Sequence, residues 1–221
     1  MSETGNPPTL DELVVCVHRH YPRGVEADDP RHQDSEESHR LVCVQEAAAM
    51  SCQWNFYDVP TEWRVPLDPC VLPVITALRA WRPLHVRWCA EIPAMELWDE
   101  SNPWLSACYR YSAVRPNYAP EADEWYDPVT CVVSILAPVY ALYTCSNAPG
   151  EHKRARYSAF PDRYQERLAA LSRLVEEMLG FHRLEEEVLL HPVLDVVPGS
   201  SNLLLGEATM RDCLFSSRVR A

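Results

Sequence analysis

Glycine is scarce in this chain, with six among 221 residues, and their spacing fits no phosphate-binding loop. The sequence contains neither GxGxxG nor GxxxxGK followed by serine or threonine, patterns in which glycines let the backbone approach a phosphate closely. It also lacks GxSxG, the strand-to-helix turn that exposes a nucleophilic serine. These absences argue against nucleotide-binding loops and against a serine hydrolase of that type.

Closely spaced cysteine pairs are missing as well. The chain has nine cysteines, an odd number, and no CxxC pair of the kind that ligates zinc. Most lie in apolar runs such as LVVCV and VTCVV, which is typical of reduced, buried thiols. The first residues, MSETGNPPTLDEL, show neither the basic nor the apolar region of a secretory signal. We therefore expect a cytoplasmic protein with free thiols.

Two partial metal motifs are each broken at one position. Cys70 begins a deaminase-like PCxxC, but Pro73 stands where the second cysteine would be. His182 and Glu185 begin an HxxEH motif, but Glu186 replaces the second histidine. We expect no metal and no other cofactor.

Basic residues are outnumbered, with 20 Lys and Arg against 32 Asp and Glu, for a net charge of -12. Residues 1–50 hold ten acids and four bases, and residues 91–127 hold eight acids and two bases. Such a chain would repel the phosphates of nucleic acid, so we expect no nucleic-acid partner. A basic protein is a better candidate partner, because oppositely charged surfaces attract each other and so raise the association rate.

Helical periodicity appears in four segments. The first begins at a capping-box pattern of Thr9 and Glu12, and a second begins near Asp34 or Ser35 and runs through RLVCVQEAAAM. A short third helix is predicted over 73–81. The fourth covers 161–179, with Gly180 as its C-terminal signal. The apolar stripe of this last helix comprises Tyr164, Leu168, Leu171, Val175 and Met178.

Strands are predicted where the apolar period changes to two. The segments are LHVRWCAEI (84–92), LSACYRYSAV (105–114) and EATMRDCLF (207–215). A fourth segment, 129–145, has no charge, but Pro138 would break a membrane-spanning helix there. We predict two central strands, or one strand bent at Ala137–Pro138, and no membrane span. The expected fold class is α+β, with a mostly antiparallel central sheet, flanking helices and a helical N-terminus. It forms one domain over 1–221, helical over about 9–81 and sheet-forming over about 84–215.

Acids and aromatics occur together in two predicted connections, 93–104 and 115–127. Aromatic side chains supply binding area, and acids select a basic partner. The alternative is that these rings only cover the sheet edge and core. The predicted partner-binding residues are Trp98, Asp99, Glu100, Trp104, Tyr118, Glu121, Asp123, Glu124, Trp125 and Tyr126.

Catalytic alternatives stay open on the sequence. Asp99, Glu100, Asp123 and Glu124 offer carboxylate pairs for glycoside hydrolysis, and the many cysteines and histidines offer Cys–His pairs. The CxHxH run that begins at Cys16 is typical of a helix C-terminus, where the helix dipole favours positive groups. We therefore keep an unrecognised hydrolase and a generic intracellular adaptor as alternative functions.

The chain resembles immunity proteins of bacterial polymorphic toxin systems, and is similar to the immunity protein 52 type. The resemblance rests on WDESNPWLSACYRYS, on YDPVTCVVSILAPVYALYTC and on GEATMRDCLFSSR. It implies a non-enzymatic protein that binds and neutralises a cognate toxin. Toxins paired with this type are often nucleases, whose surfaces are basic where they meet phosphates. An acidic inhibitor would cover such a surface or occlude it from beside the active site.

Overall fold

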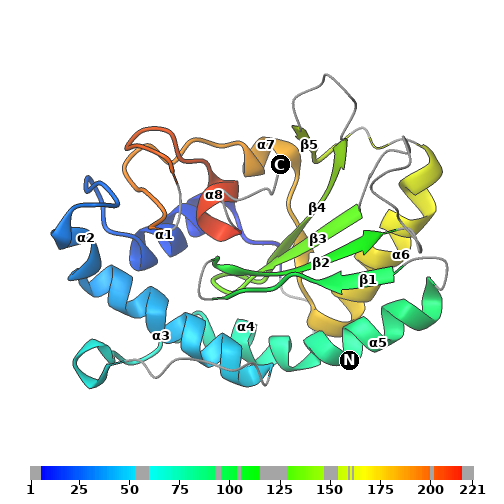
Figure 1. Ribbon diagram of the computed structural model, residues 1–221, viewed down its shortest axis with the longest axis horizontal. Helices are drawn as coiled ribbons and strands as arrows, with labels where there is room; N and C mark the ends of the chain where they lie inside the picture. Colours follow the sequence, from blue (N-terminus) through cyan, green and yellow to red (C-terminus); the bar gives the residue numbers. More distant parts are fainter. Residues whose placement is uncertain are drawn as a thin grey trace, which may run out of the picture.

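The computed structural model describes residues 6–52, 60–92, 96–103, 106–114, 129–146, 154–158, 160, 162–199 and 202–215. Its helices and its mostly antiparallel sheet confirm the α+β fold class and the helical N-terminus (Figure 1). The helices are α1 (Leu10–His20), α2 (Pro30–Gln33), α3 (Glu36–Ser51), η1 (Thr61–Trp63), α4 (Leu72–Ala77), η2 (Leu78–Ala80), α5 (Trp81–Glu91), α6 (Asp162–Leu179), α7 (Glu186–Leu189) and α8 (Met210–Leu214). The strands are β1 (Glu96–Asp99), β2 (Cys108–Val114), β3 (Val129–Ser134), β4 (Val139–Ser146), β5 (Arg154–Arg156) and β6 (His182–Arg183).

The N-terminal helices begin at the caps that the sequence predicts. The backbone N–H of Thr9 donates to Glu12 Oε2 at 2.7 Å, and Thr9 Oγ1 accepts from the Glu12 N–H at 3.3 Å, which completes the capping box of α1. Ser35 caps α3 by accepting from the N–H of Ser38. The two helices pack against each other. The acidic stretch between them contains the short helix α2, which begins after Asp29.

The strand predicted over 84–92 is wrong, because these residues lie in α5 apart from Ile92, its C-cap. Its buried residues, Trp81, Leu84 and Trp88, are three and four positions apart, which is the spacing of one face of a helix. Val86, which a strand would bury beside them, is 70% exposed. The predicted helix over 73–81 is present as α4 and η2, and it leads directly into α5.

The sheet is a meander with the order β1-β2-β3-β4-β5, in which every neighbouring pair is antiparallel. β6 pairs in parallel with the start of β4. β2 confirms the strand predicted within 105–114, and β3 with β4 confirms the pair predicted within 129–145. Ser134 Oγ holds the turn between them by accepting from the N–H groups of Leu136 and Ala137. None of the helices in the described ranges has the length and apolar character needed to cross a membrane.

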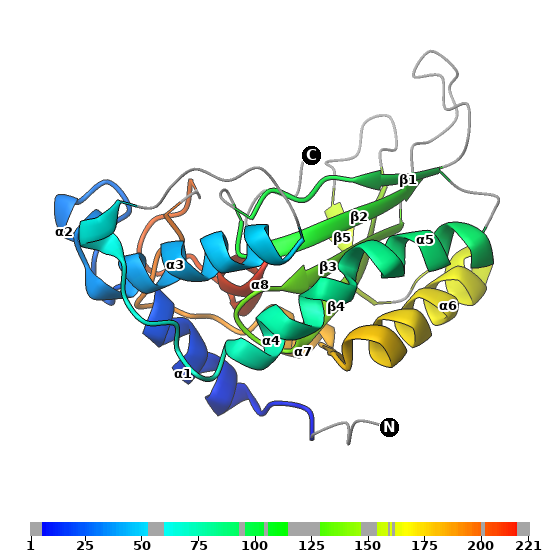
Figure 2. The ribbon, with the colours of Figure 1, turned by 90° about the horizontal axis from the view of Figure 1, so that it is seen from below.

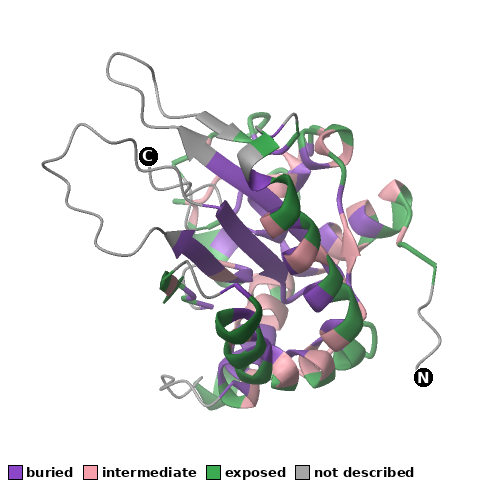
Figure 3. Ribbon diagram, turned by 90° about the vertical axis from the view of Figure 1, so that its right-hand side faces the viewer, coloured by how far each residue is buried: buried purple, intermediate pink, exposed green. Residues whose placement is uncertain are grey.

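Helices α5 and α6 lie side by side over one face of the sheet (Figure 2). The Trp81 ring stacks on Tyr111 of β2 with centroids 4.1 Å apart. Tyr140 of β4 donates its hydroxyl proton to Glu176 Oε1 of α6 at 2.7 Å. The described side chains of β2, β3 and β4 are almost all buried, whereas β1 and the helices also present exposed residues (Figure 3).

Helix α6 confirms the helix predicted over 161–179. Leu168, Leu171 and Val175 are buried in the core, and Met178 packs against it while partly exposed. Gly180 follows the helix with φ 70°, in the left-handed region where a residue without Cβ is favoured.

The C-terminal segment returns to the N-terminal helices, and its predicted strand over 207–215 is wrong. Met210–Leu214 form α8, and only Thr209 makes a single bridge, with Pro192. The Thr209 N–H donates to Asp212 Oδ2 at 2.9 Å, which fixes the start of the helix. α8 packs on α1 (Figures 1 and 2).

Candidate functional site

Strand β1 is the first strand in the sheet order, and the described members of the predicted binding set lie on it or, in the case of Glu100, directly after it. We predicted a connection over 93–104, but Glu96–Asp99 form a strand that pairs with β2 from Glu96↔Val114 to Asp99↔Tyr111. Glu96, Trp98, Asp99 and Glu100 are all exposed, and Trp98 is 44% exposed. We call these four residues the acidic edge.

Hydrogen bonds hold two carboxylates of the acidic edge in place. Asp99 Oδ1 accepts from the Ser101 N–H at 3.0 Å, and Glu100 Oε2 accepts from the Ser112 hydroxyl at 2.6 Å. Ser101 joins the edge to β2, because its Oγ accepts from the Arg110 N–H at 2.9 Å. The two charges therefore need little further ordering before they meet a partner, and that reduces the entropy cost of binding.

The other predicted binding residues cannot be placed beside the acidic edge. Seven of them lie outside the described residues: Trp104, Tyr118, Glu121, Asp123, Glu124, Trp125 and Tyr126. The binding set as a whole therefore stays a prediction.

Internal contacts engage much of the second acidic region, residues 26–37. Glu26 Oε2 accepts from the Leu205 N–H at 3.1 Å, Asp29 accepts from the N–H and side chain of Arg31, and Glu36 pairs with Arg40. Asp28 and Asp34 are exposed. Because three of its carboxylates are used to hold the fold, this region offers a partner fewer uncommitted charges than its composition indicates.

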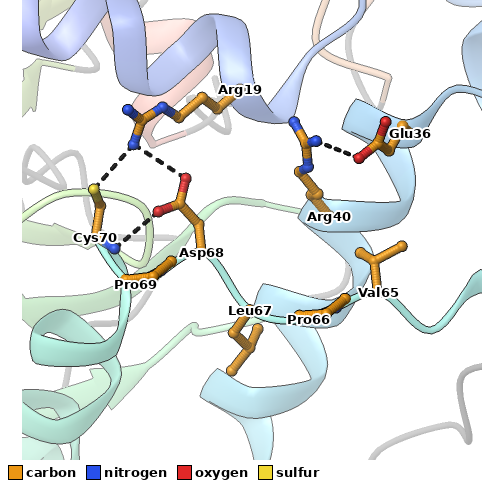
Figure 4. Close-up of a pocket in the computed structure, with 9 residues that line it drawn as sticks. All are labelled: Arg19, Glu36, Arg40, Val65, Pro66, Leu67, Asp68, Pro69 and Cys70. Carbon is orange, nitrogen blue, oxygen red and sulfur yellow. Dashed lines mark hydrogen bonds and ion pairs between the residues drawn. The ribbon is translucent and has the colours of Figure 1, made fainter.

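A pocket of about 610 Å³ opens between α1, α3 and the segment that leads into α4 (Figure 4). Its walls carry two guanidinium groups, two carboxylates and one thiol. The sequence does not predict this site, because its residues come from three separate segments and the partial PCxxC motif at Cys70 is broken at Pro73. The lining residues are Arg19, Glu36, Arg40, Val65, Pro66, Leu67, Asp68, Pro69 and Cys70.

Arg19 links the charged groups on one wall of the pocket. Its Nη1 donates to Asp68 Oδ2 at 3.1 Å and to Cys70 Sγ at 2.9 Å (Figure 4). The hydrogen bond to Cys70 and the charge of Asp68 raise the pKa of Arg19. Burial acts to raise the pKa of Asp68, but the hydrogen bonds from Cys70 and the charge of Arg19 outweigh it and lower that pKa. The carboxylate and guanidinium are therefore both charged at neutral pH.

His20, the last residue of α1, is buried inside the fold. It is 1% exposed, its Nδ1 contacts the Cys16 carbonyl oxygen at 2.8 Å, and its Nε2 has no hydrogen-bond partner among the described residues. Burial lowers the pKa of His20, and the nearby charges of Asp68, Arg40 and Arg19 also act on it. His20 is therefore a buried imidazole rather than an exposed group at a helix end.

The proposed Cys–His nucleophile has no support from the buried thiols. Burial raises the pKa of Cys16 to about 12 and that of Cys108 to about 11, so both are neutral thiols at pH 7. Within the described ranges, no group of three or more His, Cys, Asp or Glu side chains is arranged to hold a metal ion.

Comparisons with known proteins give no relative for this chain. No protein-family model, no curated protein and no solved structure matches it. Any function must therefore be argued from the residues and their geometry.

Proposed function

We propose that the chain is a non-enzymatic inhibitor that binds and neutralises a toxin domain with a basic surface, as immunity proteins of bacterial polymorphic toxin systems do. The observation that carries the proposal is the acidic edge, where an exposed tryptophan and three exposed carboxylates lie along an outer strand and directly after it. The resemblance to the immunity protein 52 type supports the same function.

The acidic edge has the two components of a protein-binding surface. Trp98 supplies a large aromatic surface, and tryptophan is enriched among residues that dominate binding energy. Glu96, Asp99 and Glu100 supply negative charge that attracts a basic partner and repels an acidic one. A basic nuclease surface that is covered in this way would be unable to reach its phosphate substrate.

The proposed compartment is the cytoplasm, where a toxin inhibitor would protect its own cell. The eight cysteines whose side chains are described are all free thiols, which is usual in a reducing compartment.

An immunity gene lies directly beside its toxin gene, so cells that express the protein encoded beside this gene provide the test. Asp99→Lys with Glu100→Lys should reduce protection and lower the association rate by about tenfold or more at low salt, because charge steers encounter. Trp98→Ala should instead raise the dissociation rate, because an aromatic side chain that the partner covers stabilises the complex after it has formed. Purified toxin and surface plasmon resonance separate the two rates, and thermal melts establish that each variant is folded.

The matched control reverses two exposed acids on the other acidic region, with Asp28→Lys and Asp34→Lys. We expect this variant to protect cells as the natural chain does. If the folded Asp99/Glu100 variant protects fully and the Asp28/Asp34 variant loses protection, the proposal has assigned binding to the wrong acidic region. If the neighbouring protein is not bound by the natural chain at all, the immunity function is rejected.

A further inference from the structure

We propose that the acidic edge binds its partner by strand addition, in which an extended basic segment of the toxin pairs with the outer side of β1 through the backbone groups of Leu97 and Asp99. This inference rests on the proposed function, because it specifies how the acidic edge holds the toxin. Three features of β1 carry it: its place in the sheet, the direction of its backbone groups and the charge of its side chains.

Strand β1 pairs with β2 on one side only. It is the first strand in the sheet order, and within the part of the chain that the structure describes no strand lies on its outer side. Figure 2 shows β1 at the margin of the sheet, with β2 on its inner side. An outer strand leaves a row of backbone N–H and C=O groups with which another chain can pair. β1 is therefore a template for an added strand.

The hydrogen bonds to β2 show which backbone groups of β1 face outward. The Glu100 N–H, directly after the strand, donates to the Arg110 carbonyl oxygen of β2 at 3.0 Å. In an antiparallel pair, such positions alternate with positions whose N–H and C=O point away from the partner strand. Leu97 and Asp99 lie an odd number of positions from Glu100 in the same register, so their backbone groups point outward. Among the described residues, these outward groups have no hydrogen-bond partner.

The side chains of the acidic edge select a basic occupant. Because side chains alternate between the two faces of a strand, Glu96, Trp98 and Glu100 share one face and Asp99 lies on the other. A lysine or arginine of an added strand that lies opposite any of these acids forms a cross-strand pair of opposite charge, which is stabilising. Two copies of this chain that paired through β1 would bring their acids together, which is unfavourable. A basic segment therefore fits this edge, and a second β1 does not.

Protection of the edge is the plainer explanation of these acids, because natural sheets carry charges on outer strands to prevent aggregation. Trp98 argues against protection alone. This side chain is 44% exposed, and an exposed aromatic ring on an outer strand favours association instead of preventing it. A strand whose charges repel its own copies and which still presents a large ring is suited to a partner of opposite charge.

Leu97→Pro tests the outward hydrogen bond. It removes the outward N–H, and proline is tolerated on an outer strand where the missing N–H faces away from the sheet. Leu97→Ala is the matched control, because it also loses the partly buried leucine side chain but keeps the N–H. We expect Leu97→Pro to bind the protein encoded beside this gene at least about tenfold more weakly than Leu97→Ala does. Isothermal titration calorimetry measures both affinities, and thermal melts establish that each variant is folded. Equal affinities would overturn strand addition.

Amide hydrogen exchange in the natural chain gives a second test, which does not depend on the folding of a variant. We expect the N–H groups of Leu97 and Asp99 to exchange at least about tenfold more slowly in the complex than in the free chain. The Glu100 N–H already pairs with β2, so its exchange should change less. NMR spectroscopy of the isotopically labelled chain follows each amide. Unchanged exchange at Leu97 and Asp99 would contradict the proposal.

The results also separate this inference from the proposed function. If Asp99→Lys with Glu100→Lys weakens binding while Leu97→Pro matches Leu97→Ala, the acidic edge binds through side chains alone. The proposed function then stands, and strand addition is rejected. If the natural chain does not bind the neighbouring protein, both are rejected. If the chain self-associates in sedimentation experiments and the Leu97 amide is protected in that assembly, a second copy occupies the edge, and the basic toxin segment is rejected.

Discussion

Desolvation acts on single side chains of this protein in two opposite directions. A thiol becomes charged when it loses a proton, so burial raises the pKa of Cys16 and Cys108. An imidazole becomes charged when it gains a proton, so burial lowers the pKa of His20. In both cases the interior favours the neutral form. The consequence for stability is measurable at His20, because its ordinary pKa lies close to neutral pH.

We predict that the protein loses stability as the pH falls below about 6.5, the ordinary pKa of histidine. The folded-state pKa of His20 is lower than that value, so the unfolded chain binds the extra proton first. The free energy of unfolding therefore decreases as the pH falls toward the folded-state pKa. Urea unfolding at pH 7.5, 6.5 and 5.5 measures this decrease.

His20→Gln removes the titrating group and should flatten the pH dependence between these values, whatever its effect on the absolute stability. His191→Gln, at a partly exposed histidine, is the matched control and should leave the pH dependence as it is. An unchanged slope in His20→Gln would show that another group controls the loss.

At the scale of elements, the sequence predicted best those segments in which the spacing of apolar residues matches either a helix or a strand, but not both. The stripe of α6 and the capping box of α1 match a helix only, and Pro138 excludes one continuous helix through β3 and β4. In α5, by contrast, Leu84, Trp88 and Ile92 fit both a spacing of four and strict alternation. Val86 decides between them, but its 70% exposure is a property of the fold and is invisible in the sequence.

The error at α8 has a different cause. The helix has only five residues, too few for a helical period to emerge, and Thr209, Met210 and Cys213 are all compatible with a strand. Its start signal was present, because Thr209 and Asp212 have capping-box spacing, with an aspartate in place of the usual glutamate.

We predict that Thr209→Ala destabilises the protein by about 0.5–2 kcal/mol, the usual effect of losing a helix cap. Asp212 Oδ2 accepts the Thr209 hydroxyl proton at 2.6 Å, and Asp212 is 3% exposed. The change therefore removes one partner from a buried carboxylate. Thr9→Ala is the comparison, because its partner Glu12 is exposed, and it should cost less. Chemical denaturation of both variants measures the difference, and an equal or larger cost for Thr9→Ala would contradict this account.

At the scale of the whole molecule, the sequence singles out three residues of the acidic edge as a candidate surface but gives no such indication of the pocket. Trp98, Asp99 and Glu100 are consecutive, so their composition alone marks a candidate surface. Arg19 and Cys70 are separated by 51 positions, and only the folded chain brings them together. Before folding, nothing distinguishes Arg19 from other arginines near a helix end.

The whole chain should contain nine free thiols. Alkylation in denaturant without reductant, followed by intact mass measurement, should add nine alkyl groups, one for each cysteine in the sequence. The buried thiols should react only after unfolding, because the core excludes the reagent. A count of seven or fewer would indicate a disulfide and contradict the proposed cytoplasmic compartment.

The contact between the two ends of the chain also determines the order in which the fold can form during synthesis. The Tyr21 hydroxyl donates to the Cys213 carbonyl oxygen at 2.8 Å, across 192 positions. Arg23 Nε and His18 Nε2 reach Asp195 at 2.7 and 2.9 Å. Helix α1 leaves the ribosome before Asp195 and α8 are made, because it precedes them in the sequence. While translation continues, α1 can pack against α3 but lacks its C-terminal partners, so a ribosome that stalls before residue 195 holds a chain whose first helix is only partly covered.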